Sequence, residues 1–255
     1  MVDRVLVASL SWVMDADADC LERVRPVLAR LIRDGVAVIG FTKGDRAELE
    51  PLRAQLNWDD PFITESGSAI FTPVDHNPFS EPLGEQDGCY FVEALGCPYV
   101  QARAGLRVLA NLISHPLKGY GDFTVPQLEK FLGVSEAVAH RAKAREFSEP
   151  FMTPKAVEAD ALMKAAEEMG FGIVLRNPAE SRFSDLVGSG ASVGGAIART
   201  LDAYRKEGAA SAVVIGGAAE LKAVGDGDWT VAEVQSLDEW LEALVRYGAA
   251  SQWRG

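Results

Sequence analysis

Short apolar runs alternate with amphipathic stretches over the first fifty residues. Val5 to Leu10 and Val36 to Phe41 have the length and composition of strands buried on both faces. Between them, residues 19–34 carry apolar positions at helical spacing, and Asp19 with Glu22 forms an expected capping box at the start. Strand, helix and strand in this order predict a parallel α/β sheet.

A second helix and a hairpin are predicted next. Asp45 with Glu48 is a capping box for a helix that extends to about residue 56. Residues 62–71 are apolar on both sides of the pair Ser66 and Gly67, which favours a hairpin that turns at these two residues.

The middle third has a different pattern. Residues 73–88 are rich in Pro, Gly and Asp, which is typical of a crossing between domains. Residues 89–176 mix strand-like pieces with helices, including one opened by Ser135 and one opened by Thr153 with a proline at its first position. A glycine-rich run, 188–195, marks a second crossing.

Regular alternation returns after residue 195. The elements expected there are a helix over 196–207, a strand over 212–215, a helix over 218–224 and a last helix capped by Ser236 with Glu239. The pattern therefore predicts an α/β protein. One discontinuous core domain (1–85 and 186–255) with a parallel sheet carries an inserted α+β cap domain (86–185).

Charge and composition narrow the function classes. The 25 basic and 37 acidic residues give a net charge of −12, which argues against nucleic acid as a partner. No apolar run reaches the roughly 18 to 20 residues of a membrane helix, and the first residues lack the order of a signal peptide. Three cysteines without a CxxC pair and three histidines without ligand spacing favour a cytoplasmic protein without a zinc site.

Two segments resemble a known family. Residues 65–71 read ESGSAIF and residues 144–151 read AREFSEPF, and Arg182 with Phe183 begins a third, weaker match. On these segments the chain resembles the haloacid dehalogenase (HAD) superfamily with a large inserted cap, and within it the mannosyl-3-phosphoglycerate phosphatases. The resemblance implies a Rossmann-like core and spans nearly the whole chain.

The resemblance also implies four catalytic motifs, and the chain departs from three of them. Ser9 and Ser11 stand where the family has a nucleophilic aspartate and an acid/base aspartate. Thr42 matches the hydroxyl residue that bonds the phosphoryl group. Gly195 stands at the expected lysine, and Gly217 stands at an expected acidic residue.

The fourth motif normally supplies ligands to magnesium. Leu221 replaces its second acid, and Glu220 is the one carboxylate nearby. Magnesium prefers hard oxygen ligands, so no cofactor is expected unless an unconventional mechanism operates. Loss of a covalent nucleophile alone typically lowers turnover by about 10⁴ to 10⁶.

Two substitutes for the missing groups are weighed. Asp15, Asp17 and Asp19 form an acidic run that either holds a metal or caps a helix beside a solvated loop. Ser9 either acts as a new nucleophile or fills the vacated pocket, and a nucleophile would need a base although no histidine lies within sixty residues.

Several residues are candidates for ligand binding. Thr42, Lys43 and Arg46 are expected to face one crevice, where they either hold a phosphate without metal or are solvated charges. The run that contains Ser192 either cradles an anion or acts as a hinge. In the cap segment, Arg145, Ser148 and Glu149 either contact a sugar or glycerate or have a structural role in the cap. Ser68 and Arg182, in the other two resembling segments, are further candidates for ligand binding.

Two functions of different classes follow. The first is a non-catalytic binding or regulatory protein for a phosphorylated sugar acid or a protein partner. The second is a hydrolase acting on a sugar phosphate by a non-standard or residual mechanism, which would need Ser9. The loss at three motifs together favours the first.

Overall fold

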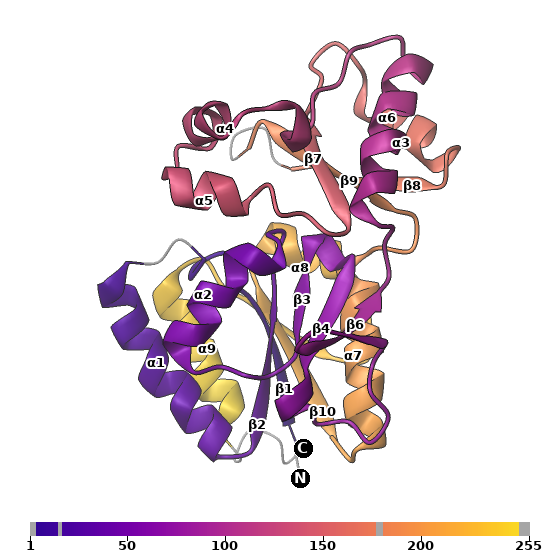
Figure 1. Ribbon diagram of the computed structural model, residues 1–255. Helices are drawn as coiled ribbons and strands as arrows, with labels where there is room; N and C mark the ends of the chain where they lie inside the picture. Colours follow the sequence, from indigo (N-terminus) through magenta and orange to yellow (C-terminus); the bar gives the residue numbers. More distant parts are fainter. Residues whose placement is uncertain (1–3, 15–16, 177–180, 250–255) are drawn as a thin grey trace.

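A computed structural model of the chain describes residues 4–14, 17–176 and 181–249. The larger of two lobes is built on an eight-stranded sheet of order β11-β10-β1-β2-β3-β4-β6-β5 (Figure 1). Its strands are β1 (Arg4–Ser9), β2 (Val36–Phe41), β3 (Phe62–Thr64), β4 (Ala69–Pro73), β5 (Glu85–Asp87), β6 (Tyr90–Ala94), β10 (Ser211–Gly216) and β11 (Thr230–Glu233). The predicted α/β fold with a mostly parallel central sheet is confirmed.

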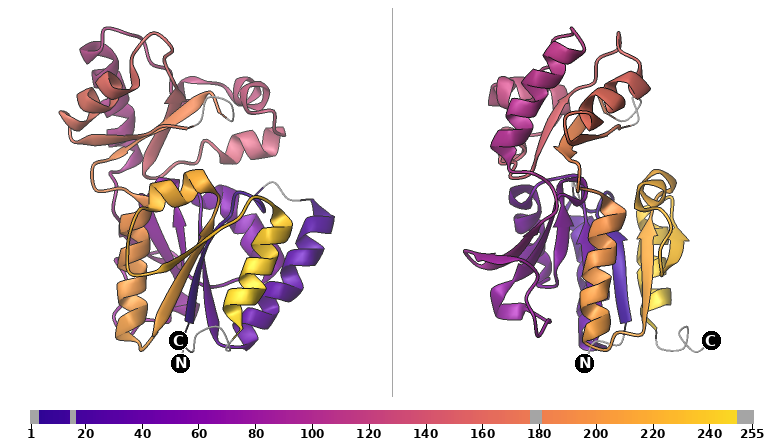
Figure 2. Two further views of the ribbon diagram at one scale, coloured as in Figure 1. Left: turned by 180° about the vertical axis from the view of Figure 1, so that it is seen from behind. Right: turned by 90° about the vertical axis from the view of Figure 1, so that its right-hand side faces the viewer.

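Helices cover both faces of this sheet: in the left view of Figure 2 an orange helix lies on one side of the strands, and yellow and indigo helices lie on the other. One face packs against α1 (Ala18–Arg33), α2 (Arg46–Leu56) and α9 (Leu237–Gly248), and the other packs against α7 (Val193–Lys206) and α8 (Ala218–Val224). In β1, Leu6 and Ala8 join the first core while Val5 and Val7 join the second. This two-sided burial explains why the strand is apolar at every position.

The small lobe (95–188) is built on a three-stranded antiparallel sheet of order β7-β9-β8. Its strands are β7 (Ser148–Met152), β8 (Phe171–Val174) and β9 (Phe183–Gly188), and its helices are α3 (Tyr99–Leu112), α4 (Val125–Leu132), α5 (Glu136–Arg141) and α6 (Ala159–Glu167). Short 3₁₀ turns lie at Glu65–Gly67, Val74–His76 and Tyr120–Asp122. Within the described ranges, no helix is both long and apolar enough to cross a membrane.

Helix starts were predicted with mixed success. The capping box of Asp45 with Glu48 is confirmed. The N-cap of the first helix lies two residues earlier than expected. Asp17, and not Asp19, accepts a free N–H of the first turn, that of Cys20. The helix expected at Thr153 is wrong: Thr153 bonds Ser184 across the sheet, its N–H donates to Arg182, and α6 starts six residues later.

The limits of the two lobes also differ from the sequence pattern. Residues 86–94 were expected in the cap, but β5 and β6 pair with the large sheet as an antiparallel edge hairpin. Residues 186–188 were expected in the core, but they belong to β9 of the small sheet. Proline and glycine in 73–88 thus form a loop before an edge hairpin, and the chain leaves the large sheet after Ala94.

The predicted hairpin over 62–71 is confirmed, and its turn has an unusual backbone. Glu65, Ser66 and Gly67 have φ of +49°, +59° and +84°, in the left-handed region that side chains disfavour. A Cβ atom at Gly67 would lie 2.3 Å from the carbonyl carbon of Ser192, at the start of α7. Gly67 therefore lets the turn press directly against the backbone of that helix.

We expect Gly67→Ala to lower the free energy of unfolding by about 2 to 4 kcal/mol, because it combines a positive φ with a backbone clash. Gly88→Ala is the matched control: Gly88 also has a positive φ, +58°, but nothing lies within 4 Å of its Cβ position. It should cost about 1 kcal/mol. Urea unfolding measures both, and equal losses would contradict the steric argument.

Candidate functional site

Three parallel strands end at the same edge of the large sheet, under the small lobe (Figure 1). In the register of the ladders, Ser9 of β1 lies beside Phe41 of β2, and Ala8 lies beside Ile215 of β10. The carboxyl ends of parallel strands are where open α/β sheets bind ligands. We call the residues at and just after these three strand ends the crevice: Ser9, Ser11, Thr42, Lys43, Gly217 and Glu220.

Ser9 and Ser11 form a hydrogen-bonded chain with Glu220. The buried Ser9 hydroxyl donates to Glu220 Oε1 at 2.6 Å, and the two serine oxygens are 3.1 Å apart. The second Glu220 oxygen accepts the backbone N–H of Gly217 at 2.9 Å. Glu220 was named in the sequence only as a nearby acid, although its place three residues after Gly217, at the start of a helix after a strand, was a usable signal.

The two glycines that stand at charged positions of the family motifs have different surroundings. A Cβ at Gly217 would touch the Trp12 ring at 3.4 Å, so the indole borders the place where the acid would lie. Gly195 is exposed, and its N–H donates to the Ser192 hydroxyl at 3.0 Å as part of the N-cap of α7. Neither position brings a charge to the crevice.

Magnesium, which the family resemblance implies, does not fit the described residues of this crevice. Both oxygens of Glu220 are already bonded, and the positions of the other implied ligands hold serine, glycine and leucine. No three His, Cys, Asp or Glu side chains lie together within 4–14, 17–176 and 181–249 in a way that could hold a metal. Asp15 of the acidic run lies outside those residues, and Asp17 caps α1.

Thr42 and Lys43 lie in the crevice as expected, whereas Arg46 is engaged elsewhere. Thr42 Oγ1 accepts the N–H of Gly44 at 3.0 Å. No described residue forms an ion pair with the Lys43 ammonium. Arg46 bonds Glu146 at 2.9 Å and Glu50 at 3.0 Å, which raises the pKa of its guanidinium.

Glu65 joins the two lobes through three hydrogen bonds. Its carboxylate, 1 % exposed, accepts the backbone N–H groups of Glu146 at 2.9 Å and Phe147 at 3.1 Å and the Ser148 hydroxyl at 2.6 Å. Burial raises the pKa of the Glu65 carboxyl, and these bonds and Arg145 oppose the shift. Ser148, a candidate for ligand contact, thus bonds the large lobe instead. Ser68, also a candidate, is part of the turn itself and donates to the Glu65 carbonyl at 2.6 Å.

Arg145 makes a second set of contacts between the lobes. It donates to the Lys43 carbonyl at 2.7 Å and lies 3.6 Å from Asp45 and 3.7 Å from Glu48. Desolvation raises the pKa of Asp45 to about 7, against the attraction of Arg145. With Glu65 and Asp185 also close by, four carboxylates act on one guanidinium.

The last two candidates in the small lobe lie apart from the crevice. Glu149 is fully buried, where it pairs with Arg103 at 2.9 Å and accepts the Gly121 N–H at 3.0 Å. Arg182 is exposed and lines a separate apolar groove of about 600 Å³ beside Thr153. Sequence reasoning missed the ion pair of Arg176 with Asp185, at 2.7 Å. The Asp185 carboxylate also accepts a hydrogen bond from the Ser66 hydroxyl of the turn.

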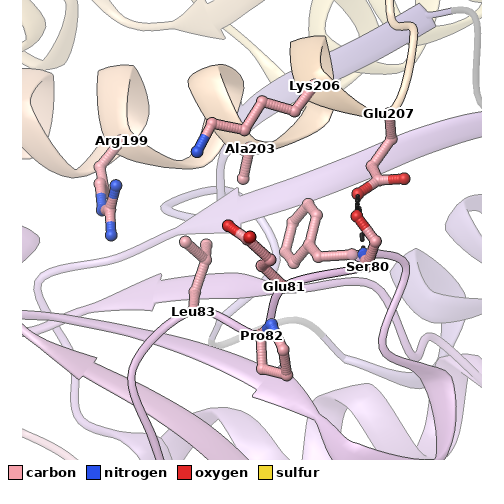
Figure 3. A pocket seen from close by; sticks show the side chains of 9 residues that line it. Ser80, Glu81, Pro82, Leu83, Arg199, Ala203, Lys206 and Glu207 are labelled. Atoms are coloured by element: carbon pink, nitrogen blue, oxygen red, sulfur yellow. Dashed lines mark hydrogen bonds between the residues drawn. The ribbon is translucent and has the colours of Figure 1, made fainter.

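A further cavity of about 390 Å³ lies against α7, away from the crevice (Figure 3). Arg199 and Lys206 from the helix and Glu81 from the facing segment point into it, while Glu207 is bonded to Ser80. Arg199 also pairs with Glu93 at 3.0 Å. Nothing in the sequence pattern marked this cavity.

Solved structures with this arrangement define the class of fold. The chain superposes on the sucrose-phosphatase of Synechocystis sp. PCC6803 with a TM-score of 0.57 and 12% identity, covering 97% of this chain and 98% of that one. For a HAD-superfamily phosphatase of Bacteroides thetaiotaomicron the TM-score is 0.59, with 14% identity and coverage of 96% and 95%. The fold is that of the HAD-superfamily phosphatases.

Sequence comparison identifies the family. The chain is 32% identical over 192 residues to a mannosyl-3-phosphoglycerate phosphatase of Pyrococcus horikoshii, covering 75% of this chain and 74% of that protein. It is 29% identical over 172 residues to a glucosyl-3-phosphoglycerate/mannosyl-3-phosphoglycerate phosphatase of Persephonella marina, of which it spans 61%. No protein-family model matches the chain. The chain belongs to the mannosyl-3-phosphoglycerate phosphatase family.

The raised pKa of Asp45 predicts a pH dependence of stability. Because the folded-state pKa, about 7, exceeds the ordinary value of 3.8, the folded chain binds this proton more tightly, so stability should fall as pH rises between these values. Relative to Asp45→Asn, which keeps an N-cap, the wild type should lose more than about 1 kcal/mol from pH 4 to 7. Asp17→Asn at the exposed cap of α1 is the control. Identical slopes for both variants in urea unfolding would contradict the prediction.

Proposed function

We propose that this chain is a non-catalytic member of its family that binds a sugar acid of the glycosyl-glycerate type, phosphorylated or not, in the crevice between the lobes. The observation that carries the proposal is the bond of Ser9 to Glu220 at 2.6 Å. The position of the implied nucleophile therefore holds a serine hydroxyl that already donates its proton to Glu220. The named activities of the relatives supply the ligand class.

The contacts between the lobes support binding without chemistry. Glu65 and Arg145 hold the small lobe over the sheet edge with buried bonds that need no metal. Below them, the hydroxyls of Ser11 and Thr42 and the ammonium of Lys43 are polar groups suited to a sugar or a glycerate. A protein partner at the crevice mouth is the alternative occupant, and failure of every sugar acid to bind would favour it.

We expect the wild-type chain to release no phosphate from mannosyl-3-phosphoglycerate above the uncatalysed rate, with or without magnesium. The matched variants are Ser9→Asp with Ser11→Asp, which restores both carboxylates beside Glu220, and Ser11→Asp alone, which restores no nucleophile. Release by the double variant alone would show that the crevice still accepts the family substrate. Magnesium-dependent release by the wild type at about 1 to 10 per second would overturn the proposal.

A second candidate function rests on the same pair. A serine nucleophile needs a neighbouring base, and Glu220 lies at hydrogen-bond distance from Ser9. In this reaction the Ser9 oxygen would attack phosphorus as its proton passes to Glu220, and the bond from phosphorus to the ester oxygen would break, so that the alcohol leaves with a proton from solvent. Water would then attack the phosphoserine and release phosphate, and Glu220 would return its proton to the Ser9 oxygen.

The two candidates differ in what mutation does. If a slow phosphate release is detected, the second candidate predicts that Ser9→Ala and Glu220→Gln each abolish it. Ser80→Ala, which removes a hydroxyl bonded to Glu207 beside the α7 cavity, should leave it unchanged. Activity that survives Ser9→Ala would exclude Ser9 as the nucleophile.

A further inference from the structure

The hydrogen bonds of the crevice run in one direction, from Ser11 through Ser9 to Glu220, and this direction favours some ligands of the proposed function over others. We infer that it recognises the unphosphorylated, hydroxyl-rich acid, a glycosyl glycerate, in preference to its phosphate ester. The inference rests on the proposed function and concerns the same site. It is carried by the direction of the bonds from Ser11 through Ser9 to Glu220 and by the charges around them.

The first step is the direction of the chain of hydroxyls. Ser9 gives its only hydroxyl proton to Glu220, so in the contact of 3.1 Å between the two serines Ser11 must be the donor. The Ser9 oxygen also accepts the backbone N–H of Ser11 at 3.4 Å, which leaves it no further capacity. While this chain of bonds is kept, Ser11, its exposed end, has only lone pairs left for a further partner, and a ligand that needs a donor must break the bond from Ser11 to Ser9.

The second step is what such an end can bind. An acceptor needs a donor, and a sugar or glycerate hydroxyl supplies one. A phosphate dianion carries no proton and can only accept hydrogen bonds, so its lone pairs would face those of the Ser11 oxygen. Thr42 differs: its oxygen accepts the backbone N–H of Gly44 and keeps its own proton for the ligand. Together these hydroxyls match a group that both donates and accepts.

The third step is the charge. A ligand atom bonded to Ser11 is at most three hydrogen-bond lengths from the Glu220 carboxylate, within the roughly 8 to 10 Å over which salt leaves charges unscreened. A phosphate ester brings two further negative charges to this distance. The family resemblance places a lysine at residue 195 to offset them, but Gly195 has no side chain.

The described cations around the crevice do not replace that lysine. Arg145 faces Asp45 and Glu48, Arg46 bonds Glu146 and Glu50, and Arg176 pairs with Asp185. Lys43, next to Thr42, has no ion pair with a described residue. One ammonium balances the carboxylate of a glycosyl glycerate but not an added phosphate as well.

The test is isothermal titration of the whole chain with mannosyl glycerate and with mannosyl-3-phosphoglycerate, at equal pH and ionic strength and without metal. We expect the unphosphorylated acid to bind about tenfold more tightly or better. Glu220→Gln should reduce this preference at least threefold, because it removes the charge and adds a donor while glutamine still suits the capping box. Glu239→Gln is the matched control, since Glu239 is the capping glutamate of α9 and accepts Gln235 N–H at 2.8 Å.

Each outcome decides between the inference and the proposed function. Equal or tighter binding of the phosphorylated acid overturns the inference and leaves the proposed function standing. Binding of neither acid overturns both, because no sugar acid then occupies the crevice. A preference for the unphosphorylated acid that is unchanged in Glu220→Gln also overturns the inference, since its stated cause would be absent.

Discussion

One buried carboxylate holds the two lobes in register. Glu65 lies in a turn of the large lobe and accepts three hydrogen bonds from consecutive residues of the small lobe, Glu146 to Ser148. A buried carboxylate without these donors would cost several kcal/mol, so the segment that supplies them cannot move away freely. The contact brings Arg145 onto Lys43 and Asp45, next to Thr42 in the chain.

The polar groups of the crevice differ in kind from those that join the two lobes. Around Arg145 and Glu65, charges are desolvated and paired, which makes that region rigid and specific in shape. At the strand ends the groups are mainly hydroxyls, with one carboxylate and one ammonium. The first region therefore fixes where a ligand fits, and the second determines which of its groups are tolerated. The proposal of a sugar-acid binder needs both.

Local patterns predicted most of the large lobe, and long-range contacts set the rest. The buried strands, the capping box of Asp45 and the α8 helix follow from short-range periodicity and were correct to within a residue or two. Thr153 had the local signals of a helix start, but pairing with Ser184, thirty-one residues away, made it part of the sheet edge. Arg46 looked available to a ligand because nothing nearby in sequence reveals Glu146, a hundred residues on.

In the candidate site too, local patterns were predictable and long-range contacts were not. Its position at the carboxyl ends of the strands was predictable from the strand pattern and the family segments. Ser148 stands in one of those segments, yet its hydroxyl bonds Glu65 across the lobes, and the Ser68 hydroxyl bonds the Glu65 carbonyl within the turn, so a match to a motif could not separate ligand contacts from structural ones. The bond between Ser9 and Glu220 joins residues 211 apart and needed the ladder of β1 with β10 to appear.

The left-handed turn at Glu65 to Gly67 restricts which residues can replace its own. Its three left-handed residues, its carboxylate and its backbone contact with Ser192 leave few replacements that fold. Ser9, Gly195 and Gly217, by contrast, have no left-handed backbone. The requirement to fold therefore falls mainly on the turn, and a chain of this fold could exchange residues of the crevice without losing the contact between its lobes.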